Sequence, residues 1–199
     1  DLENKSREGC KMKKPLSEMT ADELGRLFPI SLSDHDPEWK GLFESEKRLI
    51  EELTGVENIV RITHVGSTSV SGIKAKPIID ILLEVVEFFD KTAFIKRFVD
   101  AGYNYIPQPK NSAPHIMLVK GYTDSGFAGQ VFHIHVRFSG EWEEIKFCEY
   151  LRQHPEIAKE YEKLKIELAQ IHKYNRENYT NAKTDFITKI NEIIRSEEK

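Results

Sequence analysis

The run Ile78–Val86 constrains the fold most strongly, because its aliphatic and β-branched residues extend over the length of a central β-strand. Asp80 and Glu84 interrupt this run. A side-chain period of two points both carboxylates to one face, roughly 13 Å apart, too far for both to bind one metal ion without strong curvature. A buried carboxylate must be paired, hydrogen-bonded or metal-bound. Asp80 is therefore expected either in an ion pair, with Lys76 or Arg137, or facing a ligand.

Periodicity and capping residues predict the remaining elements. Helices are expected at residues 20–28, 36–55 and 90–102, and further strands at 59–65, 103–106, 115–119 and 131–138. Residues 122–129 are expected to form a Gly-containing loop. Apolar stripes after residue 141 predict three helices, the last covering 179–193. The sequence thus predicts the α+β (mixed α/β) class, with a mixed sheet of four to five strands flanked by helices and a helical C-terminal part at about 141–195.

Composition indicates an ordinary globular protein, with 39% hydrophobic and 31% charged residues and a formal net charge of −4. This balance argues against a general nucleic-acid coat or a membrane partner, and no apolar stretch approaches the ~20 residues of a membrane span. Two distant cysteines, Cys10 and Cys148, favour a reducing, cytoplasmic location. Residues 1–18 are expected to be a disordered lead, part of which could precede a natural start at Met12, and residues 19–199 a single domain. The oligomeric state stays open.

The loop between the first two strands has the composition of an anion site. Gly66 allows a ligand to approach the backbone, Ser67 and Thr68 offer hydroxyl and N–H groups, and Lys76 adds positive charge. The alternative is a structural connection whose hydroxyl groups only cap a turn. The pattern on its own does not decide between the two.

The segment 131–138 alternates most clearly, with a hydrophobic face opposite a face that carries His133, His135 and Arg137. Three polar side chains would be costly in a core, so this face is expected to line a cleft. His-x-His on a strand is a metal-ligand spacing, but two histidines and an arginine could equally bind a polyanion or be structural. Phosphate-loop, GxGxxG, HExxH, CxxC and GxSxG motifs are all absent from the sequence.

A family resemblance rests on several long segments: His35–Trp39, His64–Ile81, Lys120–Thr123, Val131–Phe138, Phe147–Pro155 and Tyr179–Phe186. They resemble the GrpB family of bacterial proteins, and the resemblance runs from about Met19 to Ile194. That family is similar to the nucleotidyltransferase superfamily, in which a Gly-Ser turn holds nucleotide phosphates and carboxylates on neighbouring strands hold divalent metal. The resemblance implies a nucleotide or other phosphorylated small molecule as ligand, Mg²⁺ or Mn²⁺ as cofactor and nucleotidyl transfer as the reaction.

Carried over residue by residue, the resemblance assigns roles to specific positions. Gly66 and Ser67 match the turn and Asp80 matches the first carboxylate, but Leu82 replaces the second and the histidine strand replaces the third. The expected catalytic residues are Asp80, His133 and His135, and the expected metal ligands are Asp80 and His135. The expected phosphate-binding residues are Gly66, Ser67, Thr68, Lys76 and Arg137.

Two rival hypotheses remain at this stage. The missing second carboxylate at Leu82 favours a non-catalytic module that keeps the fold and binds a small anion or a protein. The His-x-His pair, with His64 or His115 added, would instead form a site for Zn²⁺ or another transition metal.

Overall fold

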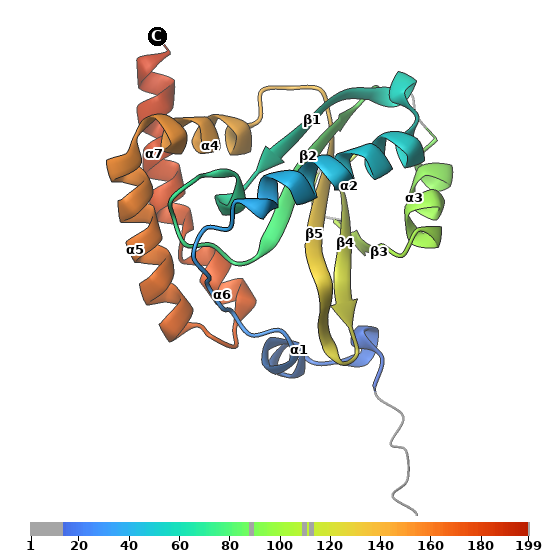
Figure 1. Ribbon diagram of the computed structural model, residues 1–199, viewed down its shortest axis with the longest axis horizontal. Helices are drawn as coiled ribbons and strands as arrows, with labels where there is room; N and C mark the ends of the chain where they lie inside the picture. The colour runs from blue at the N-terminus through green and yellow to red at the C-terminus, as the bar shows by residue number, and fades with distance from the viewer. Residues whose placement is uncertain (1–13, 88–89, 109–110, 112–113, 199) are drawn as a thin grey trace, which may run out of the picture.

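The computed structural model describes residues 14–87, 90–108, 111 and 114–198. Its centre is a five-stranded mixed sheet (Figure 1), with strands β1 Ile59–Val65, β2 Ile78–Val85, β3 Asn104–Pro107, β4 Ile116–Thr123 and β5 Gly126–Phe138. The strand order is β1-β2-β5-β4-β3. The pair β2–β5 is parallel and the other pairs are antiparallel, which confirms the predicted mixed α+β class.

The helices begin and end largely where capping residues predict. They are α1 Ala21–Leu27, α2 Glu38–Thr54, α3 Lys91–Asp100, α4 Glu143–Gln153, α5 Pro155–Ile171, α6 Arg176–Asn181 and α7 Thr184–Glu197. The predicted capping box is present, because Thr20 accepts from the Glu23 backbone and Glu23 accepts from the Thr20 backbone. Asp90 caps α3 by accepting from the Ala93 N–H.

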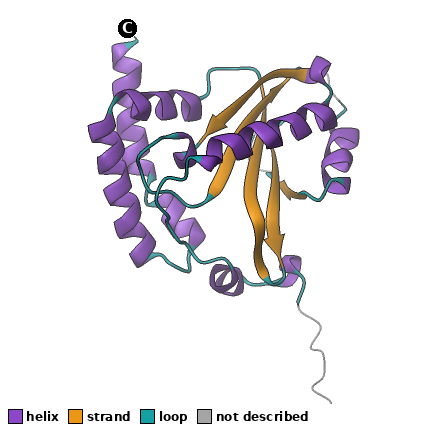
Figure 2. Cartoon of the chain, viewed as in Figure 1, coloured by secondary structure: helices purple, strands orange, loops and turns teal. Residues whose placement is uncertain are grey.

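Helices cover the sheet on two sides, as Figures 1 and 2 show. One hydrophobic core joins α2 and α3 to the alternate residues Ile79, Ile81 and Leu83 of β2 and to Phe132, Ile134 and Val136 of β5. A second core joins Val65 and Leu82 to α4, α5 and α7. The opposite face of β5, with its two histidines, therefore points toward the C-terminal helices.

Strands β4 and β5 are longer than predicted, because their pairing continues into the segment 122–129. The expected loop at 122–129 is a β-hairpin, in which Tyr122 pairs with Phe127 and Thr123 with Gly126. Gly121, at φ 92°, lies at a register shift that lets the pairing continue beyond Lys120. The Phe127 ring packs at 5.0 Å from Phe28, so the tip of the hairpin is anchored to the segment after α1.

The third C-terminal helix, predicted at 179–193, is instead two helices, α6 and α7, with a turn at residues 182 and 183 between them.

The expected disordered lead falls largely on residues 1–13, and these, with Cys10, lie outside the described residues. Within the described part of that lead, Leu16–Glu18 form a short 3-10 turn. Cys148 is buried. Over the described ranges, every helix is too short or too polar to span a membrane.

Candidate ligand and metal site

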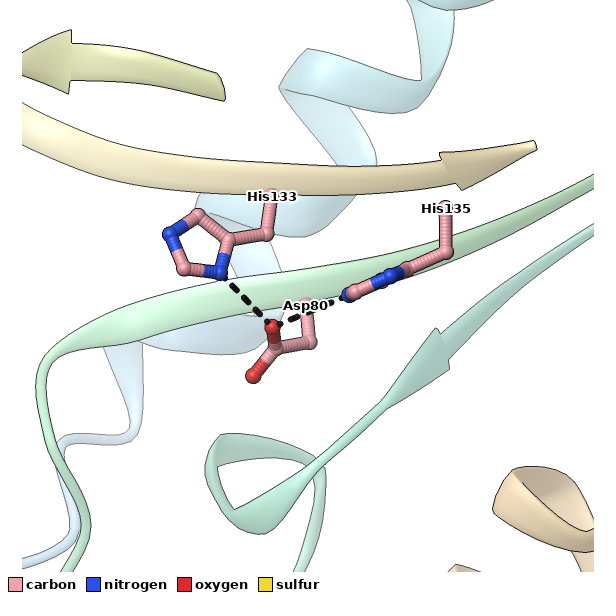
Figure 3. Close-up of side chains that lie close together, drawn as sticks. All are labelled: Asp80, His133 and His135. Atoms are coloured by element: carbon pink, nitrogen blue, oxygen red, sulfur yellow. Dashed lines mark hydrogen bonds and ion pairs between the residues drawn. The ribbon is translucent and has the colours of Figure 1, made fainter. Parts of the chain in front are cut away.

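The parallel pairing of β2 and β5 brings the three predicted catalytic residues together. Asp80 pairs with His133 and Leu82 with His135 in the register of the two strands. Figure 3 shows the Asp80 carboxylate between the two imidazole rings. Asp80 Oδ1 lies 3.3 Å from His133 Nδ1 and 3.4 Å from His135 Nε2, and all three atoms lie within 4.8 Å of one another. The predicted alternative, an ion pair of Asp80 with Lys76 or Arg137, is not present among the described residues.

A hydrogen-bond chain orients His133 from behind. Its Nδ1 faces a carboxylate, which can only accept, so Nδ1 carries the proton in this arrangement. Its Nε2 then accepts from the Tyr122 hydroxyl at 2.7 Å, and the Tyr122 oxygen accepts from Arg176 Nη2 at 3.0 Å. Burial lowers the pKa of His133, while the Asp80 carboxylate opposes that shift. His133 is thus held as a neutral imidazole.

Asp80 is ionised and closely approached by the loop before β2. Burial acts to raise the pKa of Asp80, but hydrogen bonds from His133 and His135 outweigh it and the pKa lies below its usual range. Gly66 turns the chain beside it at φ 71°. A Cβ at this position would lie 2.6 Å from Asp80 Oδ2, so only glycine allows both the turn and the approach.

The cluster opens into a cavity of about 610 Å³ between the sheet and the C-terminal helices. Four cationic side chains line it: Lys76, Lys165, Arg176 and Lys183. Lys76 and Lys183 lie over the ring of Tyr179, at 5.3 and 4.7 Å from its centre. In the part of the chain that the structure describes, none of the four has a carboxylate oxygen within 4.0 Å.

The pKa values of the cavity lysines are lowered, and a bound anion would raise them again. Burial, with nearby Arg176 and Lys183 adding to it, lowers the pKa of Lys76 to about 8. Burial also lowers the pKa of Lys165 to about 7 and shifts that of Lys183 downward. A bound polyanion would supply the missing negative charge and stabilise the ammonium forms. The two glutamates that line the cavity are already paired with arginines, Glu143 with Arg195 and Glu144 with Arg137.

Among the residues predicted to bind phosphate, Gly66, Ser67 and Lys76 line the cavity. Thr68 also lines it, but its hydroxyl donates to the Ile78 carbonyl and contacts His64 Nε2, each at 3.0 Å. Because a hydroxyl has one hydrogen, the Thr68 side chain has none left to donate to a phosphate.

Arg137 lies apart from the cavity, contrary to its predicted role. It is two residues beyond His135, about 7 Å along the strand. Its guanidinium lies 3.8 Å from Glu144 and 5.6 Å from the centre of the Trp142 ring, and Arg137 is not among the residues that line the cavity.

The cluster contains one carboxylate, as expected from the leucine at position 82, where the nucleotidyltransferase pattern has a second carboxylate. Leu82 is 1% exposed and packs in the second core. Glu84, also buried, is bound by Arg61 and by the Gly140 N–H at 3.2 Å. His64, considered as a further metal ligand, stacks on Phe43 at 4.9 Å instead, and neither it nor His115 belongs to the cluster.

Sequence reasoning missed the residues that the C-terminal helices contribute. One signal was available: Lys165 and Lys183 each follow a buried tyrosine by four residues, Tyr161 and Tyr179, so each interrupts an apolar pattern of the sequence. Lysine in such a position is uncommon unless it has a polar task. Tyr122 had no comparable signal, because it lay in a segment predicted to be a loop.

Comparison with known proteins gives a consistent family. The glutamate-rich protein GrpB of Alkalihalophilus pseudofirmus is 35% identical over 164 residues, covering 81% of this chain and 93% of that protein. The crystal structure of the conserved protein GrpB from Enterococcus faecalis superposes with a TM-score of 0.73 at 30% identity, covering 84% and 99% of the two chains.

A more distant likeness is to the Cid1 poly(U) polymerase bound to MgGTP, with a TM-score of 0.47 at 11% identity over 75% of this chain and 45% of that chain. A likeness this weak supports no conclusion about activity. The family model described as GrpB protein matches residues 29–192. The chain therefore belongs to the GrpB family.

Proposed function

We propose that the protein binds a nucleotide or another phosphorylated small molecule in the cavity between its sheet and its C-terminal helices, with nucleotidyl transfer as its reaction. One observation carries the proposal: four cations without carboxylate partners among the described residues line the same cavity as the Asp80 cluster. Lys165 is buried and the other three cations are half-buried, and such positions are unfavourable in the absence of an anion, so this concentration of positive charge favours a ligand with several negative charges.

The cations give the phosphates a defined place. Lys165 and Lys183 extend from α5 and the start of α7, and Lys76 comes from the loop before β2, so a phosphate chain would be contacted from both walls. Ser67 adds a hydroxyl on the sheet side. Apolar side chains, among them Phe147, Leu151 and Ile187, line other parts of the cavity and suit a base or another apolar group.

In nucleotidyl transfer, the protein's own residues would perform two tasks. Lys165, Lys183 and Arg176 would stabilise the negative charge that develops on the phosphoryl oxygens. The ionised Asp80 lies at the cavity and would accept the proton of an attacking hydroxyl group as its oxygen bonds to the α-phosphorus and pyrophosphate leaves, while His133 holds the carboxylate in place. Both tasks use groups that already face the cavity.

The two-magnesium arrangement implied by the nucleotidyltransferase resemblance does not fit these residues. Mg²⁺ prefers oxygen ligands in octahedral geometry, and the cluster offers one carboxylate beside two imidazoles. The place of a second carboxylate is held by buried Leu82. The proposed reaction therefore assigns no step to a magnesium pair, and Mn²⁺, which accepts both donor types, is included in the test.

A second candidate is a non-catalytic module that binds the same class of ligand. The burial of Leu82 in the second core favours it, because a second carboxylate could not be restored there without disrupting the packing. The two candidates differ only in turnover. They share the prediction that the cavity binds a phosphorylated ligand.

The binding experiment compares the melting temperature of the protein with ATP, GTP, CTP, UTP and inorganic triphosphate, with Mg²⁺ or Mn²⁺ present. A ligand at a hundredfold excess over its Kd stabilises the fold by about 2.7 kcal/mol. We expect Lys165→Met and Lys183→Met to lose this shift. The exposed lysines Lys163 and Lys189 lie on the same helices, so Lys163→Met and Lys189→Met are matched controls that should respond as wild type.

The outcome that overturns the binding proposal is a wild type that responds to none of these compounds, or cavity variants that respond as fully as the controls. Turnover is tested separately, by mass spectrometry of the nucleotide with and without a mixture of hydroxyl acceptors. Product formed by wild type but not by Asp80→Asn supports nucleotidyl transfer. Binding without product supports the non-catalytic module.

A further inference from the structure

We infer that Asp80, His133 and His135 form a binding site for one divalent transition ion of the Fe²⁺-to-Zn²⁺ range, with an open coordination side toward the cavity. The inference rests on the proposed function only in taking the cavity as the place where a ligand meets the ion. Its observations are the spacing of the three donor atoms, their chemistry and the support behind His133.

The distances between the donor atoms fit ligands around an ion, and they are long for the hydrogen bonds that the two histidines make to Asp80. Charge-assisted N–H···O contacts are about 2.7–2.9 Å long. Both histidine nitrogens lie farther from Asp80 Oδ1, at 3.3 and 3.4 Å. Bonds of about 2.1 Å in a tetrahedral zinc site place neighbouring ligand atoms about 3.4 Å apart. Two of the three distances between donor atoms therefore match those of a coordination sphere, and the third, between the two histidine nitrogens, is within 4.8 Å.

The donor set selects the class of ion. Imidazole nitrogen suits Zn²⁺, Fe²⁺, Cu²⁺ and Ni²⁺, whereas Mg²⁺ prefers oxygen donors and retained water. Two imidazoles with one carboxylate recur in sites that keep positions free for water or substrate. Asp80 and His133 come from paired positions of parallel strands and His135 follows on the same face, so the sheet fixes all three donors.

Tyr122 and Arg176 supply the support that a metal-bound histidine needs. An ion on His133 Nδ1 moves the ring proton to Nε2, and Nε2 then donates to the Tyr122 oxygen. The Tyr122 oxygen stays in place because Arg176 also donates to it. Partners of this kind fix the ring orientation of a ligand histidine, and losing one lowers metal affinity by about 10- to 100-fold.

The ion would also reconcile the cluster with an anionic ligand. An ionised Asp80 repels a phosphate that enters the same cavity. A divalent ion on Asp80 reverses the sign of the local charge and leaves coordination positions for a phosphate oxygen. The glycine at position 66 keeps the space beside Asp80 Oδ2 free of a side chain.

The test uses untagged protein stripped with a chelator and titrated with metal alone. We expect one Zn²⁺ or Co²⁺ per chain, with visible Co²⁺ absorption bands typical of nitrogen and oxygen donors, and no competition from millimolar Mg²⁺. His133→Ala and His135→Ala should each lower Zn²⁺ affinity by at least about 100-fold, and Tyr122→Phe by about 10-fold. His172→Ala, a histidine outside the cavity, is the matched control.

Circular dichroism and melting of each apo variant separate loss of the site from loss of the fold, and His135→Asn gives a second, smaller change at the same position. Wild-type affinity in both histidine variants, or equal affinity of the wild type for Mg²⁺ and Zn²⁺, overturns the inference. The two proposals fail separately. Lys165→Met should bind Zn²⁺ normally while losing nucleotide, so a protein that binds metal but no phosphate refutes only the proposed function.

Discussion

Lys165 lies four residues after Tyr161 on α5, and its ammonium group lies 4.9 Å from the centre of the tyrosine ring while it donates to the Lys74 carbonyl. The lysine is 2% exposed, so this charge is held inside the protein by a ring and a carbonyl group. Burial of this ammonium group lowers the stability of the fold, and in the proposed function it places a positive charge where an anion would bind. Replacing Lys165 is therefore expected to change both the stability of the fold and the binding of an anion.

We expect Lys165→Met to stabilise the apo protein at pH 7 while it abolishes binding of phosphorylated ligands. Burial, with Lys183 and Lys76 adding to it and Glu162 opposing, lowers the pKa of Lys165 from 10.5 to about 7. Between these values the unfolded chain binds more protons at this side chain than the folded protein, so wild-type stability rises with pH across that window, by on the order of 3 to 5 kcal/mol. Urea denaturation at pH 7, 8 and 9.5 measures the rise.

In Lys165→Met that rise should be smaller, because the remaining slope comes from Lys76 and Lys183, whose pKa values burial also lowers. Lys163→Met, at an exposed position of the same helix, should keep the full slope. An unchanged slope in Lys165→Met would show that Lys165 is not held with a lowered pKa.

Gly66→Ala should disrupt the Asp80 cluster. The new Cβ would lie 2.6 Å from Asp80 Oδ2 on a backbone at φ 71°, so the carboxylate or the turn must move. We expect a loss of about 1 to 3 kcal/mol in the free energy of unfolding, and a loss of Zn²⁺ binding. Gly72→Ala is the matched control, because φ there is 79° but a Cβ would meet nothing within 4 Å. A Zn²⁺ affinity lowered equally in both variants would argue against a specific contact with Asp80.

Thr68→Val should weaken the fold without weakening ligand binding. The hydroxyl is buried between His64 Nε2 and the Ile78 carbonyl, and its loss leaves two buried polar groups unsatisfied, at about 1 to 3 kcal/mol. Chemical denaturation measures the loss, and Thr68→Ser, which keeps the hydroxyl, should recover most of it. A nucleotide Kd that rises more than tenfold in folded Thr68→Val would instead restore the phosphate contact predicted from sequence.

Glu84→Gln should lower the stability of the fold without changing metal affinity, because this second carboxylate of β2 lies outside the proposed metal site. Glu84 is 1% exposed and is held by Arg61 and the Gly140 N–H, so removing its charge should cost about 1 to 3 kcal/mol of stability. Zn²⁺ affinity, measured on the same preparation, should stay at the wild-type value. A reduced affinity would mean that Glu84 contributes to the cluster after all.

The periodicity of the sequence predicted the strands of the sheet, apart from the hairpin at 122–129, and the residues of one wall of the site. The strict alternation at 131–138 places His133 and His135 opposite a buried face, and the acidic interruption at Asp80 marks the strand beside it. These patterns are local, and the side-chain period of two converts each of them directly into a face. The fold class and the convergence of the three side chains follow from them together with the family resemblance.

The other wall could not be predicted, because it depends on how helices rotate against the sheet. Lys165 and Lys183 are separated from Asp80 by 85 and 103 residues, and no local pattern states which sheet face they meet. The hairpin that delivers Tyr122 was also missed, since its glycines indicate a loop equally well. Arg137 was predicted on the correct face of β5, but the face alone does not say where along the strand the cavity ends, and Arg137 is not among the residues that line it.

The cavity has one wall from the sheet and another from the segment α4 to α7, which lies late in the chain. During synthesis on the ribosome, this cavity is incomplete until the chain has emerged beyond Asn191, which also lines it. A phosphorylated compound bound there, as proposed, would contact the sheet and these late helices together and would stabilise their packing against each other.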